Sequence, residues 1–131
     1  MNLVAQYTPS ISGEVLCPGD KSISQRAVII GSLLNEDIEI SGFLNGEDPI
    51  STANALNAIG SSIKINGTSV SIKKRDIPFK DPSVNVDLGN SGTGMRLMMG
   101  LISSLGIKAT LVGDESLTKR PMLRVANPLN D

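Results

Sequence analysis

The 131-residue chain contains no histidine and no tryptophan, and Cys17 is its only cysteine. Without histidine, imidazole acid–base catalysis and the usual zinc sites are excluded, and a single cysteine forms neither an internal disulfide nor a multi-cysteine metal site. The only aromatic residues are Tyr7, Phe43 and Phe79, and the net charge is −1, so neither base-stacking platforms nor a broad basic surface is expected. We therefore expect no metal, no cofactor and no nucleic-acid partner.

Long hydrophobic runs are also absent. No apolar run reaches the length that spans a membrane, and residues 1–7 carry no basic segment ahead of an apolar run, as a signal peptide would. This pattern predicts a soluble, cytoplasmic protein without a membrane partner. Apolar residues still make up 40% of the chain, enough for one domain with an aliphatic core, in which we expect Cys17 to be a small buried residue.

The periodicity of the apolar residues predicts a mixture of helices and strands. Helices are expected at 21–34, 49–59 and 93–105 and from Pro121 to about Asn127, and strands at 1–7, 11–17, 37–44, 62–65, 69–72, 84–88 and 107–112. The dipeptide Asn66–Gly67 predicts a hairpin, and Asp48 is expected to cap the second helix. Helices 21–34 and 93–105 are apolar around most of their circumference, which predicts that both are buried.

The chain also contains an internal repeat. Gly19 and Arg26 lie 70 residues before Gly89 and Arg96, and each unit has the order strand, buried helix, strand, helix, to which the first unit adds the hairpin. We expect an N-terminal segment at 1–12, a first unit at 13–83 and a second unit at 84–131 that ends before its own hairpin. The sequence is therefore interpreted as a fragment of an α+β protein.

The first candidate site is the turn at residues 18–26, with the sequence PGDKSISQR. Lys21 and Arg26 are cations near the start of a helix, where they do not complement the helix dipole, and Ser22 and Ser24 add hydroxyls beside free backbone N–H groups. A helix N-terminus of this kind binds anions. The alternative is a serine-capped helix with two solvated cations.

A second candidate is the turn at residues 89–96, with the sequence GNSGTGMR, whose glycines allow backbone N–H groups to approach a ligand. It lacks the GK[ST] ending of a P-loop, which argues against a nucleotide. Lys119 and Arg120 form a third cationic stretch just before a helix. The alternatives are a tight strand-to-helix turn and an exposed basic loop, and the basic run at residues 73–75 is interpreted as solvated.

Together these stretches resemble three signatures of the 5-enolpyruvylshikimate-3-phosphate synthase family, at residues 18–26, 88–96 (LGNSGTGMR) and 113–122 (GDESLTKRPM). Their order and spacing also match, so the resemblance covers nearly all of the chain. It implies a two-lobed fold in which each lobe holds three βαβαββ units, with helices inside and mixed sheets outside. The sister family, the UDP-N-acetylglucosamine enolpyruvyl transferases, typically has asparagine after the first lysine and a reactive cysteine in a later loop. Ser22 and the cysteine-free segment 114–119 favour the shikimate enzymes.

The resemblance implies that the enolpyruvyl group of phosphoenolpyruvate is transferred to the 5-hydroxyl of shikimate 3-phosphate and that phosphate is released. It implies a catalytic Lys21 in contact with both substrates, with Ser22 and Arg26 binding shikimate 3-phosphate. The residues implied for the phosphoenolpyruvate site are Lys21, Asn90, Gly92, Thr93, Arg96 and Arg120. The acidic general acid/base residues of that family lie outside this chain.

Completing such a site requires the remainder of a parent chain, so residues 1–131 alone are expected to be inactive. In that family the first segment packs with the other lobe. Residues 1–12 and the shortened second unit are therefore expected to leave sheet edges unpaired, which favours self-association. The alternative hypothesis is a stand-alone anion-binding or interaction module derived from such a lobe.

Overall fold

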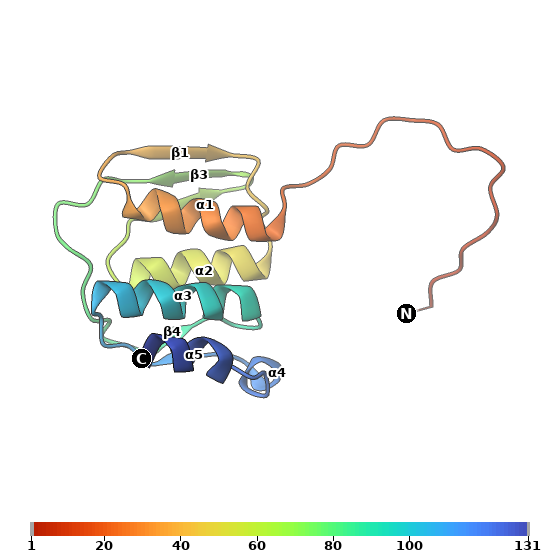
Figure 1. Ribbon diagram of the computed structural model, residues 1–131. Helices are drawn as coiled ribbons and strands as arrows, with labels where there is room; N and C mark the ends of the chain where they lie inside the picture. The colour runs from red at the N-terminus through yellow and green to blue at the C-terminus, as the bar shows by residue number, and fades with distance from the viewer. Residues whose placement is uncertain (1, 131) are drawn as a thin grey trace.

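The computed structural model describes residues 2–130, and its mixture of helices and sheets confirms the expected α+β class. Helices α1 (Lys21–Leu33), α2 (Glu47–Ala58) and α3 (Gly92–Leu105) form its centre. A three-stranded sheet lies on one side of them, and a two-stranded sheet and the last helix lie on the other (Figure 1). The remaining elements are β1 (Ile38–Ser41), β2 (Ile63–Asn66), β3 (Ser69–Ile72), β4 (Val86–Asp87), β5 (Leu111–Val112), α4 (Glu115–Thr118) and α5 (Leu123–Asn130).

Two of the long helices begin where the sequence supplies a capping side chain. Asp20 accepts a hydrogen bond from the N–H of Ile23 at 2.7 Å at the start of α1, and Ser91 accepts one from the N–H of Gly94 at 3.0 Å at the start of α3. The cap predicted for the second helix is wrong, because α2 begins one residue before Asp48. An aspartate in the first turn still complements the positive end of the helix dipole, so the residue type is favourable although its position differs.

The hairpin predicted at Asn66–Gly67 is confirmed. β2 and β3 pair antiparallel with Ile65 opposite Val70, and Gly67 has a φ of 59°, a left-handed conformation that glycine adopts without strain. β1 pairs antiparallel with the other edge of β3, with Ile40 opposite Val70, which gives the strand order β1-β3-β2. The sheet of the first unit is therefore completed by β1, which is separated in sequence from the β2–β3 hairpin by helix α2.

The core between the sheet and the helices is largely aliphatic, as expected, with Phe43 as its one fully buried aromatic residue among residues 2–130. Gly31 allows α1 to lie close to β3, because a Cβ atom there would come within 2.7 Å of Ile72 Cδ1. Burying a large aliphatic side chain stabilises a fold by about 1.5–3 kcal/mol. The hydrophobic side chains with no exposed surface are Val28, Leu56, Ile59, Val70, Leu88 and Met98.

The two helices predicted to be buried on all sides differ from each other. On α1, Ile23 and Ile30 are 60% and 57% exposed, so the prediction is wrong for that helix. One face of α1 packs on α2 and the sheet, and within residues 2–130 nothing covers the opposite face. The prediction is closer for α3, which buries Met95, Met98, Leu101 and Ile102.

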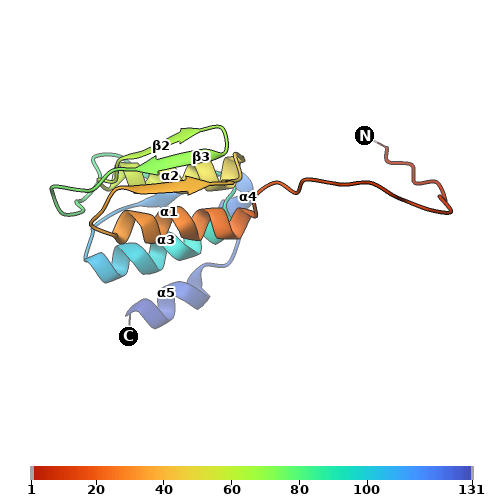
Figure 2. The same cartoon turned by 90° about the horizontal axis from the view of Figure 1, so that it is seen from above.

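The N-terminal segment carries no strand in residues 2–20, so the strands predicted at 1–7 and 11–17 are wrong for the part of the chain that the structure describes; residue 1 lies outside it. Figures 1 and 2 both show this segment leading away from the helices. Its apolar residues have no neighbouring strand to pair with, and a single extended segment is not stable as a strand by itself. Cys17, expected in the core, is exposed for the same reason.

Other elements form with shifted bounds. β4 and β5 pair in parallel over two residues each, a shorter ladder than the predicted strands 84–88 and 107–112. The short helix α4 occupies a segment for which no helix was predicted, and α5 begins at Leu123, two residues after Pro121. Among residues 2–130, no helix is both long enough and apolar enough for a membrane crossing. The unit boundaries at 12/13 and 83/84 stay a prediction.

Candidate anion-binding site

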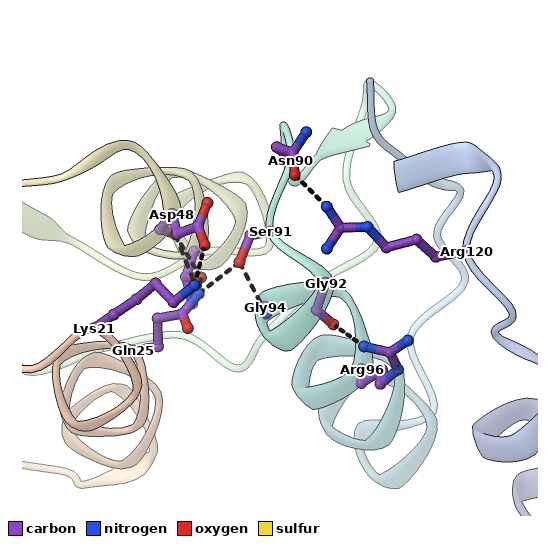
Figure 3. Close-up of polar contacts among 10 residues, drawn as sticks. Lys21, Gln25, Asp48, Asn90, Ser91, Gly92, Gly94, Arg96 and Arg120 are labelled. Carbon is purple, nitrogen blue, oxygen red and sulfur yellow. Dashed lines mark hydrogen bonds and ion pairs between the residues drawn. The ribbon is translucent and has the colours of Figure 1, made fainter. Parts of the chain in front are cut away.

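A buried glutamine joins the N-terminal ends of the three long helices. Gln25, on the second turn of α1, has no exposed surface. Its Nε2 lies 2.9 Å from Thr52 Oγ1 on α2 and 2.7 Å from Oγ of Ser91, the capping residue of α3. The same nitrogen lies 3.3 Å from the main-chain oxygen of Asp48 (Figure 3). The helix starts are therefore held side by side, with the positive ends of their dipoles at one end of the molecule.

Lys21 is the first residue of α1 and carries its charge into this cluster. Its Nζ lies 3.0 Å from Oδ2 of Asp48, in the first turn of α2. The Lys21 side chain is 51% exposed and that of Asp48 only 22%. The ammonium group is thus anchored on one side by a carboxylate and remains accessible to a ligand on the other.

The glycine-rich turn at the start of α3 packs tightly against the Gln25 cluster. A Cβ atom on Gly94 would lie 2.7 Å from Thr52 Oγ1 and 2.8 Å from Ser91 Oγ, so a side chain cannot enter without displacing buried groups. The backbone N–H groups of Gly92 and Thr93 make no hydrogen bond within residues 2–130. Free N–H groups at a helix start, together with the helix dipole, favour an anionic ligand.

Two guanidinium groups flank Gly92. Arg96 donates from Nη1 to the main-chain oxygen of Gly92 at 3.2 Å, and Arg120 donates from Nη2 to Oδ1 of Asn90 (Figure 3). A Cβ atom on Gly92 would lie 2.8 Å from Arg120 Nη1 and 3.2 Å from Arg96 Nη1. In the described part of the chain, no carboxylate forms an ion pair with either arginine. Buried Nε of Arg96 also lacks a hydrogen-bond partner there.

Asp114, which the sequence analysis did not name as a site residue, holds the Asn90 side chain that contacts Arg120. Asp114 caps α4, where its Oδ1 accepts a hydrogen bond from the N–H of Leu117 at 2.7 Å, and its Oδ2 accepts one from Nδ2 of Asn90 at 2.6 Å. The Leu117 N–H and the Asn90 amide stabilise the ionised carboxylate and lower the pKa of Asp114 from its usual value. Asp114 therefore stays charged beside Arg120.

The structure joins most of the predicted site residues through polar contacts, and Ser22 and Arg26 are not among those it joins. Ser22 and Arg26 lie on α1, where the Arg26 side chain is exposed, and neither makes a side-chain hydrogen bond in the described residues. The remaining predicted residues lie at the starts of α1 and α3 or beside Gly92: Lys21, Asn90, Gly92, Thr93, Arg96 and Arg120. Among residues 2–130 no cluster of potential metal ligands occurs. The arrangement suits a multiply charged anion rather than a cation.

Sequence reasoning missed Gln25, Asp48 and Asp114 as parts of the site. Gln25 lies in the polar first half of α1, between Ser24 and Arg26, so no local pattern marked it as buried, although a buried glutamine requires hydrogen-bond partners. Asp48 was interpreted only as a helix cap. Asp114 carried no local signal beyond its position after Gly113, because its second partner, Asn90, lies 24 residues earlier.

Comparisons with known proteins identify the family of the chain. The family model of EPSP synthase (3-phosphoshikimate 1-carboxyvinyltransferase) matches residues 6–131. The chain is 48% identical over 127 residues to a 3-phosphoshikimate 1-carboxyvinyltransferase of Ruthia magnifica, covering 96% of this chain and 29% of that protein. It is 46% identical over 132 residues to the enzyme of the same name from Petrotoga mobilis, covering 99% of this chain and 31% of that protein.

A solved structure gives the same result for the fold. EPSP synthase from Acinetobacter baumannii superposes with a TM-score of 0.83 at 38% sequence identity, covering 90% of this chain and 27% of that one. The chain thus spans about three tenths of the length of the curated relatives it matches, which are covered to 29% and 31%.

Proposed function

The chain belongs to the EPSP synthase family, and from this premise we propose that it supplies an anion-binding part of a 3-phosphoshikimate 1-carboxyvinyltransferase. Such an enzyme transfers the enolpyruvyl group of phosphoenolpyruvate to the 5-hydroxyl of shikimate 3-phosphate and releases phosphate. The observation that carries the proposal is the pair of guanidinium groups on either side of Gly92, neither of which has a carboxylate partner in the described residues. Both substrates are multiply charged anions that such groups bind well.

The roles proposed for the site residues are those that the family resemblance implies. Arg96 and Arg120 would hold phosphoenolpyruvate at the free N–H groups of Gly92 and Thr93, with Asn90 at its edge. Exposed Arg26 and half-buried Ser22 would bind shikimate 3-phosphate from α1. Neither side chain makes a hydrogen bond in the described residues, so the ligand would supply the partners of both.

Lys21 would contact both substrates. Its ammonium is paired with Asp48 at 3.0 Å, and its side chain is half exposed, which leaves it accessible to a ligand. Fixed donors and cations stabilise charge that develops in a transition state, because they need not reorganise as the reaction proceeds. The same ammonium could take part in proton transfer.

Activity would also depend on residues beyond this chain. We expect no turnover from residues 1–131 alone, since a reacting geometry requires groups that close around both substrates. Phosphate release above background from the purified chain, with both substrates present, would contradict this expectation.

The decisive experiment replaces Arg120 with alanine in the complete protein that contains this chain. The KM for phosphoenolpyruvate should rise by at least about tenfold, because a charge-assisted hydrogen-bond donor to the ligand is lost. Lys119→Ala is the matched control, since it removes the same charge from the adjacent position, where Lys119 is 71% exposed and paired with Glu115. An equal effect of the two substitutions, or none from Arg120→Ala, would refute the proposed site.

A further inference from the structure

Asp114 uses its two carboxylate oxygens on different partners. Capping α4 requires only Oδ1, which accepts from the N–H of Leu117 at 2.7 Å. Asp20, which caps the longer helix α1, makes that single kind of contact, to the N–H of Ile23 at 2.7 Å. The second oxygen of Asp114 is therefore free for another role, and it accepts from Nδ2 of Asn90 at 2.6 Å.

This contact decides which way the Asn90 amide faces. A side-chain amide has a donor end and an acceptor end, and only the donor end can face an ionised carboxylate. With its Nδ2 on Asp114, Asn90 presents Oδ1 to Nη2 of Arg120 and accepts a hydrogen bond from it. In the reverse orientation, an NH2 group would face the guanidinium, and neither group could accept.

Arg120 depends on this acceptor for its placement. The Arg120 side chain is exposed, and it borders a cavity of about 490 Å³ lined largely by apolar side chains, so packing does not hold it on that side. In residues 2–130, the contact with Asn90 is the one side-chain hydrogen bond that Arg120 makes. That contact places Nη1 within 2.8 Å of the position a Cβ atom on Gly92 would take.

We propose that Asp114 is a positioning residue for phosphoenolpyruvate binding: it orients the Asn90 amide, and the amide in turn holds the Arg120 guanidinium beside Gly92. The inference rests on the proposed function for the identity of the ligand. Asp114 itself does not touch the ligand. Because Arg120 is already held in place before the ligand binds, this long, exposed side chain loses less conformational entropy on binding.

The test is Asp114→Asn in the complete protein. Asparagine caps helices about as well as aspartate, so α4 should persist. The atom that faces Asn90 becomes an amide nitrogen instead of a carboxylate oxygen. The Asn90 side chain then turns around or is left unpaired, and Arg120 loses its acceptor. The KM for phosphoenolpyruvate should rise about fivefold to tenfold, the net effect of one ordinary hydrogen bond. The kcat at saturation, the KM for shikimate 3-phosphate and the melting temperature should stay unchanged.

Glu115→Gln is the matched control. It removes a carboxylate from the next residue of the same short helix, and the Glu115 side chain is 88% exposed and bonded to Lys119 instead of Asn90. Its KM for phosphoenolpyruvate should equal that of the unmodified protein. If both substitutions raise the KM equally, the effect is one of general charge and the positioning role is overturned. A change in melting temperature with an unchanged KM overturns it as well.

A second measurement separates this inference from the proposed function. In protein labelled with 15N, the two side-chain amide protons of Asn90 should resonate far apart, because one of them donates to a carboxylate, and Asp114→Asn should bring them together. If this change occurs while Arg120→Ala leaves all kinetic constants unchanged, the proposed function fails although the contact exists. If Arg120→Ala raises the KM for phosphoenolpyruvate and Asp114→Asn does not, the positioning role alone is wrong.

Discussion

At the scale of single residues, the positive charge of the site comes from two arginines that lie beside one glycine. Arg96 and Arg120 come together at Gly92, a position with no side chain of its own. Guanidinium groups on the same side of a short turn repel each other, and in the described residues no carboxylate forms an ion pair with either one. The absence of a side chain at Gly92 is therefore what allows both guanidinium groups to lie beside this residue.

We predict that Gly92→Ala weakens phosphoenolpyruvate binding without weakening the fold. The new methyl group would lie 2.8 Å from Arg120 Nη1 and 3.2 Å from Arg96 Nη1, the far ends of two flexible side chains that can move aside. In the complete protein the KM for phosphoenolpyruvate should rise about tenfold, as for the loss of one charge-assisted contact.

The control lies on the same helix. A Cβ atom on Gly100 would meet nothing within 4 Å, so Gly100→Ala should leave the KM unchanged and stabilise α3 by about 0.5–1 kcal/mol. Thermal unfolding and steady-state kinetics of the two variants distinguish the effects. A drop in melting temperature for Gly92→Ala, with unchanged kinetics, would mean that the two arginines do not form the ligand site.

At the scale of elements, the end of β3 is tied to the start of β1 by one carboxylate. Asp37 Oδ2 lies 2.7 Å from Nζ of Lys73, and its Oδ1 accepts from the N–H of Lys74 at 2.8 Å. The hydrogen bond from Lys73 and that from the Lys74 N–H lower the pKa of Asp37, and the same pair raises the pKa of Lys73. Both shifts indicate a pair that is charged at neutral pH.

We predict a pH-dependent contribution from this link. A carboxyl group whose pKa is lowered by folding stabilises the fold above its unfolded pKa, and the stabilisation is lost as the pH falls through its folded pKa. The difference in urea midpoint between the unmodified chain and Asp37→Asn should therefore be largest near neutral pH and disappear as the pH falls through the lowered pKa of Asp37. Because both side chains are exposed, salt should reduce the difference too. A difference that persists unchanged at acidic pH would contradict the assignment.

The N-termini of α1, α2 and α3 depend on Gln25 for their alignment. We predict that Gln25→Ala lowers the free energy of unfolding by about 2–3 kcal/mol, since it removes hydrogen bonds to Thr52 and Ser91 and leaves a cavity at a fully buried site. Gln6→Ala, in the exposed N-terminal segment, should have no effect. Urea unfolding measures both. Equal stability of the two variants would show that the helices are aligned by hydrophobic packing alone.

At the scale of the whole molecule, the N-terminal segment exposes apolar surface that a monomer does not cover. Leu3, Val4 and Tyr7 are 90%, 83% and 92% exposed, and Leu16 is 99% exposed. The strand order β1-β3-β2 leaves one edge of β1 without a partner among residues 2–130. An extended apolar segment and an open sheet edge together form the two halves of an intermolecular contact.

We predict that the 131-residue chain self-associates through this segment. Sedimentation over a wide range of concentration should show a mass that rises with concentration, and replacing Leu3, Val4 and Tyr7 with serine should shift the chain towards monomer. Serine at Asn2, Gln6 and Thr8, neighbouring polar positions, is the control and should change nothing. A monomer at every concentration would mean that the open edge and the segment do not attract each other.

Local chemistry by itself determined much of this protein. The three long helices, the hairpin at Asn66–Gly67 and the glycine-rich turn before Arg96 were predictable, because caps, turn glycines and apolar periodicity act between residues close in sequence. The resemblance to a family likewise rested on three short motifs, and it indicated most of the residues that gather at the helix starts.

Only the tertiary structure decided which of these residues touch and which segments pair. The contact of Gln25 with Ser91 joins residues 66 apart in sequence. The contact of Arg75 with the main-chain oxygen of Ser32 joins residues 43 apart. The interpretation of the basic run at residues 73–75 as solvated is therefore wrong for Arg75. The Cζ atom of Arg75 also lies 3.6 Å from the centroid of the Phe79 ring, a cation–π contact. The apolar residues before Pro18 formed no strand for the same reason: a strand exists only where another strand accepts its hydrogen bonds, and no local pattern specifies that neighbour.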